Sequence, residues 1–327
     1  MLGRTEQVAA SEEAERPLTV GFVLVPGFAL MSYTAAVEPL RAANALSGRT
    51  LYRWWHAAPG NGPVQASNGV AILPDVAVGN ASAADRVQAD RVFVCAGGNP
   101  SRFDDPALSA WLRRLARRGV ALGGISGGPY VLARAGLLDG RRCTLHWEHL
   151  PAFRESFPRV PVVRSLFEIA GDRMTSSGGI AGLDMMLHLV TRDHGADLAA
   201  RISDWFLHDR IREGVSPQRM APRERFGVRD PRLVRVLAAM EEHIEAPLPR
   251  AALAALARMS VRQLERLFRD GLGTGLHRHY LALRLDRAQA LRRESALSAA
   301  EVAAATGFAS ADELARARRR MAGAAGG

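Results

Sequence analysis

Segments of β type alternate with helical segments along the first part of this chain, and the β type vanishes in its last third. Because parallel strands are joined by crossover helices, the alternation predicts an α/β fold in which a parallel sheet is sandwiched between helices. From Arg232 onward only short helices are expected, which predicts an all-α second domain. The strand-like segments are 18–25, 52–58, 70–73, 91–96 and 120–125, and the helical segments between them include 29–44 and 106–118.

The boundary between the two domains is expected in a stretch that lacks any apolar period. Between Glu213 and Pro231 the chain holds three prolines, two glycines and several arginines, as linkers do. The 327 residues are also too many for one ordinary core, since domains usually have roughly 100 to 200 residues. The predicted division is a disordered N-terminus at 1–16, an α/β domain at 17–212, a linker at 213–230, a helical domain at 231–321 and a tail at 322–327.

Charge and cysteine content narrow the partners and the compartment. All 43 basic residues are arginine, against 33 acidic residues. From Gly227 onward there are 17 arginines against 11 acidic residues, which favours an anionic partner. Cys95 and Cys143 have no CxxC spacing, so we expect a reducing compartment and no structural zinc. No secretory signal or membrane span is indicated, so the expectation is a cytoplasmic protein without metal or cofactor.

Residues 250–269 have the pattern of a helix-turn-helix. A short apolar helix and a tight connection come first, and Ser260 and Gln263 then form a capping box that starts a second helix. The apolar residues of the second helix, including Phe268, share one face, and arginines occupy the other. Such a basic face suits a recognition helix in the major groove, although an αα-hairpin with a solvated arginine face has the same pattern.

The pattern returns about 50 residues later, with capping boxes that begin at Ser298 and Ser310. The strings SVRQLERLFRDGLGTG, YLALRLDRAQALR and SAAEVAAATGFASADELARA resemble, in order, the first motif, linking helix and second motif of the AraC/XylS family of transcription regulators. The resemblance implies that two recognition helices enter successive major grooves of double-stranded DNA. It also implies RNA polymerase and a second copy of the chain, as a homodimer, as protein partners.

The resemblance assigns residues to the DNA interface. Arginine can fork onto guanine, so Arg262 and Arg266 are the expected base readers. The sequence departs from the family at Arg318, where an apolar aromatic residue usually fills the core. Because an arginine cannot be buried unpaired, we expect the second unit to be less stable, or to pack through Met321, and to read DNA more weakly. The residues implied to face bases or phosphates are Arg262, Glu265, Arg266 and Arg269 on the first recognition helix, and Ala311, Asp312 and Arg316 on the second.

A Gly-x-Ser-x-Gly motif at 124–128 places Ser126 between a strand-like and a helical segment. This is the geometry of a nucleophile elbow and is typical of α/β hydrolases, but no Asp and then His follow it clearly at the expected spacing. The string GGISGGPYVLARAGLLDGRRCTLHWE instead resembles the class I glutamine amidotransferase-like domains of the PfpI type. That resemblance implies a sheet of the flavodoxin/amidotransferase-like type.

The resemblance also implies a pocket at this turn. Enzymes of the PfpI type place a cysteine at the elbow, a histidine about 20 residues later and a glutamate on the helix after the first strand. Ser126, His146 and Glu38 stand at these positions, and with Trp147 they form the candidate ligand pocket. A serine needs a well-placed base where a cysteine does not, so we expect no catalysis and a pocket that binds a small molecule. Regulators with a PfpI-type domain before an AraC-type domain share this architecture, which implies a ligand sensor.

The resemblance suggests a class of ligand, and other functions remain as alternatives. Similar regulators respond to amino acids and to quaternary amines such as carnitine or glycine betaine. An aromatic cage of Trp54, Trp55 and Trp147 over a cation is physically reasonable, and the alternative is that these are packing residues. We therefore predict a transcription regulator that acts as an activator. The alternatives are an amidase or hydrolase that uses Ser126 and carries a vestigial DNA-binding domain, and a chaperone-like or structural module.

Overall fold

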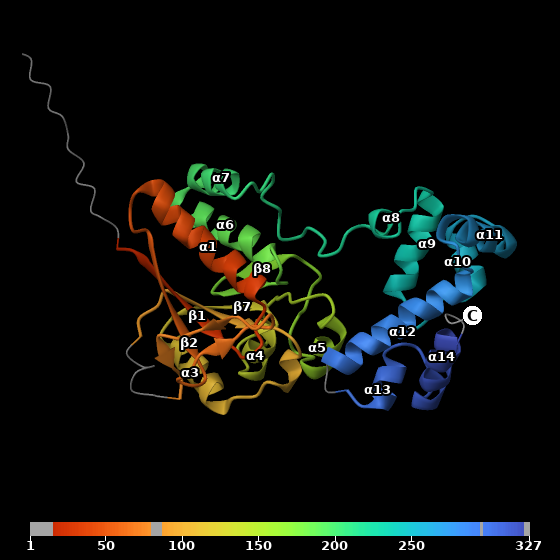
Figure 1. Cartoon of the computed structure of the whole chain (residues 1–327), viewed down its shortest axis with the longest axis horizontal. Coiled ribbons are helices and arrows are strands. Elements are labelled where there is room, and N and C mark those ends of the chain that lie inside the picture. The colour runs from red at the N-terminus through yellow and green to blue at the C-terminus, as the bar shows by residue number, and fades with distance from the viewer. Residues whose placement is uncertain (1–15, 80–86, 295–296, 324–327) are drawn as a thin grey trace, which may run out of the picture.

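The structure, a computed structural model, describes residues 16–79, 87–294 and 297–323 (Figure 1). A sheet with helices on both faces forms the first part, and a group of short helices around one long helix forms the second. The predicted fold class, an α/β sandwich followed by an all-α region, is confirmed. The N-terminus at 1–16 and the tail at 322–327 fall outside the described residues, apart from their innermost positions.

The described part of the sheet has seven strands in the order β5-β2-β1-β6-β7-β9-β8. Neighbouring strands are parallel, except that β8 and β9 are antiparallel. The inner strands are apolar along almost their whole length, as strands covered on both faces must be. The strands are β1 (Leu18–Leu24), β2 (Tyr52–Ala58), β5 (Val76–Ala77), β6 (Arg91–Ala96), β7 (Ala121–Ser126), β8 (Phe167–Ala170) and β9 (Arg173–Ser176).

The strand expected at 70–73 does not join this sheet. Instead, β4 (Ala71–Ile72) pairs with β3 (Val64–Gln65) in a separate antiparallel hairpin. Gly69 has a φ of 89° and turns the chain back between the two strands. The β-type segment expected at 70–73 is therefore a strand, but it lies outside the main sheet, and the alternating pattern did not indicate β8 and β9.

Two layers of helices cover the sheet (Figure 1). One apolar cluster joins one face to α1, α6 and α7, with Phe22, Leu40 and Met186 in its centre. The second cluster joins the other face to α3, α4 and α5, with Trp111 and Leu132 in its centre. The helices are α1 (Leu30–Ser47), α3 (Pro106–Arg117), α4 (Gly128–Arg134), α5 (Leu150–Ser156), α6 (Ala181–His194) and α7 (Ala196–Trp205), and the 3-10 turn η1 spans Pro100–Arg102.

The second part contains two helical units joined by one long helix, α12. The first unit packs around Phe268 and the second around Phe308. The capping boxes that begin at Ser260 and Ser298 are confirmed, because each serine hydroxyl accepts from the third amide and the Gln or Glu there reaches back. The helices are α8 (Pro222–Arg225), α9 (Pro231–Glu242), α10 (Arg250–Leu256), α11 (Val261–Leu272), α12 (Leu276–Glu294), α13 (Ala299–Ala304) and α14 (Ala311–Gly323).

The second helical unit rests against the sheet part. Ala152 of α5 is buried in the same apolar cluster as Leu291 of α12 and Val302 of α13. Two hydrogen bonds flank this contact: Arg287 Nη1 donates to the carbonyl oxygen of Glu148 at 2.9 Å, and Asn99 Nδ2 donates to that of Arg293 at 3.0 Å. The sheet part therefore holds α12 and α13 in a defined place beside it.

Candidate functional site

Ser126 lies at the sharp turn that the sequence predicts, where β7 ends and α4 begins. Its φ is 60°, a left-handed conformation that is costly for a residue with a side chain, and it is only 8% exposed. Gly128, two residues after it, permits close packing, because a Cβ on Gly128 would lie 2.0 Å from the carbonyl oxygen of Val94. A Cβ on Gly178 would lie 2.7 Å from the Cβ of Ser126, so a second loop also presses against the serine.

His146 lies near this turn, and its side chain is one-third exposed. Its Nδ1 is 3.6 Å from Glu148 Oε2, and its ring centre lies 5.5 Å from that of Trp147. Burial lowers the pKa of His146, and the nearby carboxylate of Glu148 opposes that effect. The imidazole is therefore neutral near pH 7.

Glu38 does not join the other predicted residues. It lies on α1, where its Oε2 accepts a hydrogen bond from Arg41 Nε at 2.7 Å. Among the described residues, no hydrogen bond connects Glu38, Ser126 and His146 with one another, and Glu38 is not in the lining of the pocket beside His146. The structure therefore brings Ser126, His146 and Trp147 to one region and leaves Glu38 outside it.

A cleft of about 230 Å³ opens beside His146, between the end of β9 and the start of α6. The loop 177–180 forms one wall and is fixed to α1, because the Gly179 amide donates to Ser32 Oγ at 2.8 Å. Ser126 lies directly behind Gly178, at the back of this wall. The lining residues are His146, Trp147, Leu166, Ser177, Gly178, Gly179, Ile180, Ala181, Arg212 and Gln218.

Two lining residues come from segments in which the sequence indicated no site. Arg212 is held by the fully buried carboxylate of Asp184, which its Nη2 contacts at 2.6 Å and its Nε at 3.0 Å. Gln218 lies in the predicted linker, and its Nε2 donates to Thr144 Oγ1, to the Leu145 carbonyl and to the Ser165 carbonyl at 3.0, 3.0 and 2.7 Å. A lone glutamine in a Pro-rich segment gives no sequence signal for such a contact.

Arg219, the residue after Gln218, contacts Trp147, which lines the cleft. The Arg219 guanidinium carbon lies 4.2 Å from the centre of the Trp147 ring, within the range of a cation–π interaction. Arg219 Nη1 is also 3.4 Å from Glu241 Oε1, on α9 of the helical part, and Arg225 pairs with the same carboxylate at 2.6 Å. The linker thus connects the lining of the cleft with α9.

The three tryptophans do not form one cage. Trp54 and Trp55 are neighbours on β2, so they point to opposite faces of the sheet and pack against different apolar clusters. Only Trp147 lines the cleft, so the packing interpretation holds for the other two. Cys95 and Cys143 are buried, and burial raises the pKa of Cys143 to about 12, as expected for thiols that serve packing.

The recognition helix of the first unit, α11, presents arginines to solvent. Arg262, Arg266 and Arg269 are exposed, while Phe268 on the opposite face is buried. Glu265 differs from its predicted place: its Oε2 accepts from the Leu276 amide at 3.3 Å, and its Oε1 is 3.9 Å from Arg250. Its carboxylate therefore braces the first turn of α12 and does not belong to the outer face.

In the second unit, Asp312 and Arg316 on α14 are exposed and Ala311 is half-buried. Arg318 is exposed as well, so no unpaired charge is buried in the core. The expected packing through Met321 does not occur within the described residues, where Ala317 packs against the apolar cluster instead. No helix in the described part of the chain is long and apolar enough to cross a membrane.

Comparison with known proteins supports both halves of this description. Residues 19–192 match the DJ-1/PfpI family, and residues 253–325 match a helix-turn-helix domain. The chain is 45% identical over 316 residues to the HTH-type transcriptional regulator GlxA of Rhizobium meliloti, with 96% of each chain covered. It is 46% identical to the HTH-type transcriptional regulator CdhR of Pseudomonas aeruginosa, over 91% of this chain and 87% of that protein.

A solved structure adds to these similarities. An AraC family transcriptional regulator from Pseudomonas putida aligns with a TM-score of 0.52 and 27% identity, over 58% of this chain and 100% of that one. The two domain resemblances drawn from the sequence motifs are therefore confirmed.

Proposed function

Because the chain belongs to the HTH-type transcriptional regulators that carry a DJ-1/PfpI domain, we propose that its sheet domain senses a small metabolite and controls DNA binding by its helical domain. The sensing domain spans 17–212, the linker 213–230 and the DNA-binding domain 231–321. We further propose that the protein acts in the cytoplasm as a homodimeric activator that recruits RNA polymerase.

The observation that carries this proposal is the path of the linker through the cleft. Gln218 lines the cleft, and its Nε2 shares its two hydrogens among three buried oxygen atoms, those of Thr144, Leu145 and Ser165; the next residue stacks on Trp147. A ligand that occupies the cleft competes with Arg219 for the face of Trp147, so it favours a different position of the linker. Because Arg219 and Arg225 also hold Glu241 of α9, a change in the linker reaches the DNA-binding domain directly.

Sensing is favoured over catalysis by the surroundings of Ser126. A serine hydroxyl is a weak nucleophile unless a base accepts its proton. Among the described residues, neither His146 nor Glu38 accepts a hydrogen bond from the Ser126 hydroxyl. The strained turn is retained without the chemistry that it serves in enzymes. We therefore assign Ser126, His146 and Trp147 to a ligand-binding site, with Arg212 and Gln218 as additional members.

An amino acid or a quaternary amine suits the charges of this cleft. The Trp147 face already holds one cation, the Arg219 guanidinium, so a ligand cation can take the same place. Arg212, which is bound to a carboxylate on one side, lies on another wall of the cleft and suits the carboxylate of a zwitterion.

The proposal is tested by thermal unfolding of the full chain with a panel of amino acids, carnitine and glycine betaine. A ligand at 100 times its Kd stabilises the folded state by about 2.7 kcal/mol, which raises Tm measurably. Trp147→Ala should abolish the shift. The control is Trp54→Phe, because Trp54 on β2 does not line the cleft.

Footprinting of genomic DNA with and without the stabilising compound then tests the coupling. We expect a protected site that spans two adjacent major grooves and whose occupancy changes with the ligand. If Ser126 is covalently labelled, amides are turned over and no such footprint is found, the sensor function is refuted and a hydrolase is supported.

A further inference from the structure

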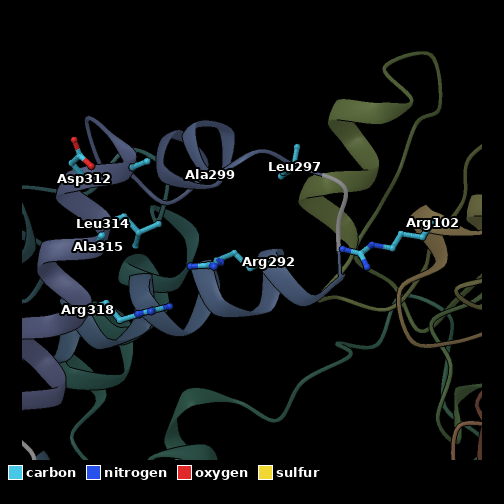
Figure 2. A pocket seen from close by; sticks show the side chains of 9 residues that line it. Arg102, Arg292, Leu297, Ala299, Asp312, Leu314, Ala315 and Arg318 are labelled. Atoms are coloured by element: carbon cyan, nitrogen blue, oxygen red, sulfur yellow. The ribbon is translucent and has the colours of Figure 1, made fainter.

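A second, larger cleft lies where the sheet domain meets the second helix-turn-helix unit. Its volume is about 500 Å³, and its charged lining comes from three separate elements: Arg102 of η1, Arg292 of α12, and Arg318 and Asp312 of α14. Figure 2 shows the side chains of Arg292 and Arg318 extending toward each other across the space between α12 and α14. This basic cleft is separate from the ligand cleft beside His146, and the proposed function gives it no role.

Arg318 opens this cleft, and its presence is the one clear departure from the AraC/XylS pattern. An aromatic side chain at this position would fill the space between α14 and α12. Here Ala317 completes the apolar cluster, and the exposed guanidinium of Arg318 lies in the cleft instead. The substitution therefore exchanges apolar filling for a positive charge, beside the exposed first turn of the recognition helix.

Arg102 is fixed at the cleft by contacts on both sides of it. Arg134 of the sheet domain donates hydrogen bonds to the carbonyl oxygens of Ser101 and Phe103, which hold η1 in place. Asn99, just before η1, donates to the Arg293 carbonyl at the end of α12. The sheet domain thus presents an arginine to the DNA-binding domain through a built contact.

The charge in the cleft calls for an anion. Three guanidinium groups and a single carboxylate, that of Asp312, line the cleft, and all four side chains are exposed. Like charges that share a cleft repel one another unless an anion lies between them. Guanidinium groups bind phosphate oxygens through paired N–H donors, so phosphate is the anion that fits this set.

Ala311 and Ala315 of α14 line the same cleft, so it opens beside the turn that is implied to enter the major groove. We propose that the cleft binds a phosphate group of the DNA backbone next to the second recognition helix. Arg292 and Arg318 hold this phosphate, and Arg102, on the far side of the cleft (Figure 2), holds a neighbouring one, so the sensing domain takes part directly in holding DNA. This proposal rests on DNA binding by the helical domain and adds a contact that no helix-turn-helix alone supplies.

The test measures how the affinity of the full chain for DNA depends on salt. A fluorescent duplex of random sequence, about 30 base pairs long, gives room for both recognition helices. Each phosphate that a protein neutralises steepens the plot of log K against log salt by about 0.9. We expect Arg102→Ala and Arg318→Phe each to flatten the slope by up to about 0.9. Because the two side chains lie on opposite sides of the cleft (Figure 2) and hold different phosphates, the double variant should lose up to about 1.8.

Arg53→Ala is the matched control, since it also removes one exposed arginine from the sheet domain, on strand β2. A slope for Arg102→Ala equal to that of Arg53→Ala, with DNA binding intact, would overturn the proposal but leave the regulator standing. If the wild-type chain does not bind DNA, both the phosphate contact and the regulator function are refuted. Arg318→Phe has the aromatic residue of the family, and a thermal unfolding curve confirms that it is folded.

Titration with inorganic phosphate separates DNA from a small phosphorylated ligand. Weak binding, with no effect of Arg102→Ala, is expected if the cleft is shaped for the backbone of a duplex. Tight binding that depends on Arg102, together with unchanged salt slopes, would assign the cleft to a small anion and refute the DNA contact.

Discussion

One residue, His149, should make the sheet domain less stable as the pH drops below the ordinary pKa of histidine. It lies at the start of α5, its side chain is only 6% exposed, and its backbone carbonyl accepts from the Phe153 amide at 2.9 Å. Burial, followed by the nearby His146 and Arg287, lowers the pKa of His149 from 6.5 to about 4. The folded chain therefore keeps this imidazole neutral at pH values where the unfolded chain protonates it.

The sign and size follow from linkage. Between pH 6.5 and pH 4 the unfolded state binds a proton that the folded state does not, so the free energy of unfolding decreases as the pH falls. The contribution of His149 is complete above about pH 6.5. Each unit of pKa difference corresponds to about 1.36 kcal/mol, and at pH 5 the loss amounts to about 2 kcal/mol.

Tryptophan fluorescence during urea unfolding measures this effect selectively. All five tryptophans lie at or before position 205, within the sheet domain, so the signal does not report the helical domain. We compare the wild type with His149→Gln, which cannot be protonated, at about pH 7.5 and about pH 5. The wild type should lose about 2 kcal/mol more than the variant over this interval.

His277→Gln, an exposed histidine on α12, serves as the matched control and should behave as the wild type does. The pKa of His146 is also lowered, but it is present in both proteins and cancels from the difference. Equal losses in the wild type and His149→Gln would refute the reasoning, because they would place the pH dependence in other groups.

Three further predictions concern other parts of the chain. Gly178→Ala introduces a Cβ at 2.7 Å from that of Ser126 at a φ of 91°, and it should destabilise the sheet domain by about 1 to 3 kcal/mol in the same fluorescence assay. Asp193→Asn weakens the buried pairing with Arg91, whose nitrogens lie 2.5 and 2.6 Å from its carboxylate, and should cost about 3 to 5 kcal/mol of unfolding free energy. Phe268→Ala should cost about 3 to 5 kcal/mol in the first helical unit, as measured by circular dichroism at helical wavelengths, and should abolish DNA binding without changing the fluorescence transition.

Local patterns were the part of this structure that the sequence predicted best. The capping boxes at Ser260 and Ser298 involve residues three apart, and the turn at Ser126 is set by the small residues around it. Contacts between distant segments were not predictable in this way. Gln218 meets its partners across 53 to 74 residues, and Glu265 braces a helix that begins 11 residues later.

One error was avoidable from the sequence. Side chains of neighbouring residues on a strand point to opposite faces, so Trp54 and Trp55 on a predicted strand cannot both face one ligand. The strand at 70–73 is a different case. Its composition suits a strand, but whether it joins the main sheet depends on where Gly69 sends the chain.

The two connections between the domains hold different parts of the DNA-binding region. The linker pairs with α9, which packs in the first unit, whereas α5 and η1 hold α12 and α13 of the second unit. Recognition helices must be about one helical turn of DNA apart to enter successive grooves, so their relative placement decides affinity. Under the proposed function, a ligand that takes the place of Arg219 on Trp147 loosens the first connection and leaves the apolar contact of Ala152 in place. In that proposal, the sheet domain thus has a fixed hold on one unit and an adjustable hold on the other, an arrangement that would convert occupancy of a small cleft into a change in the spacing of two helices.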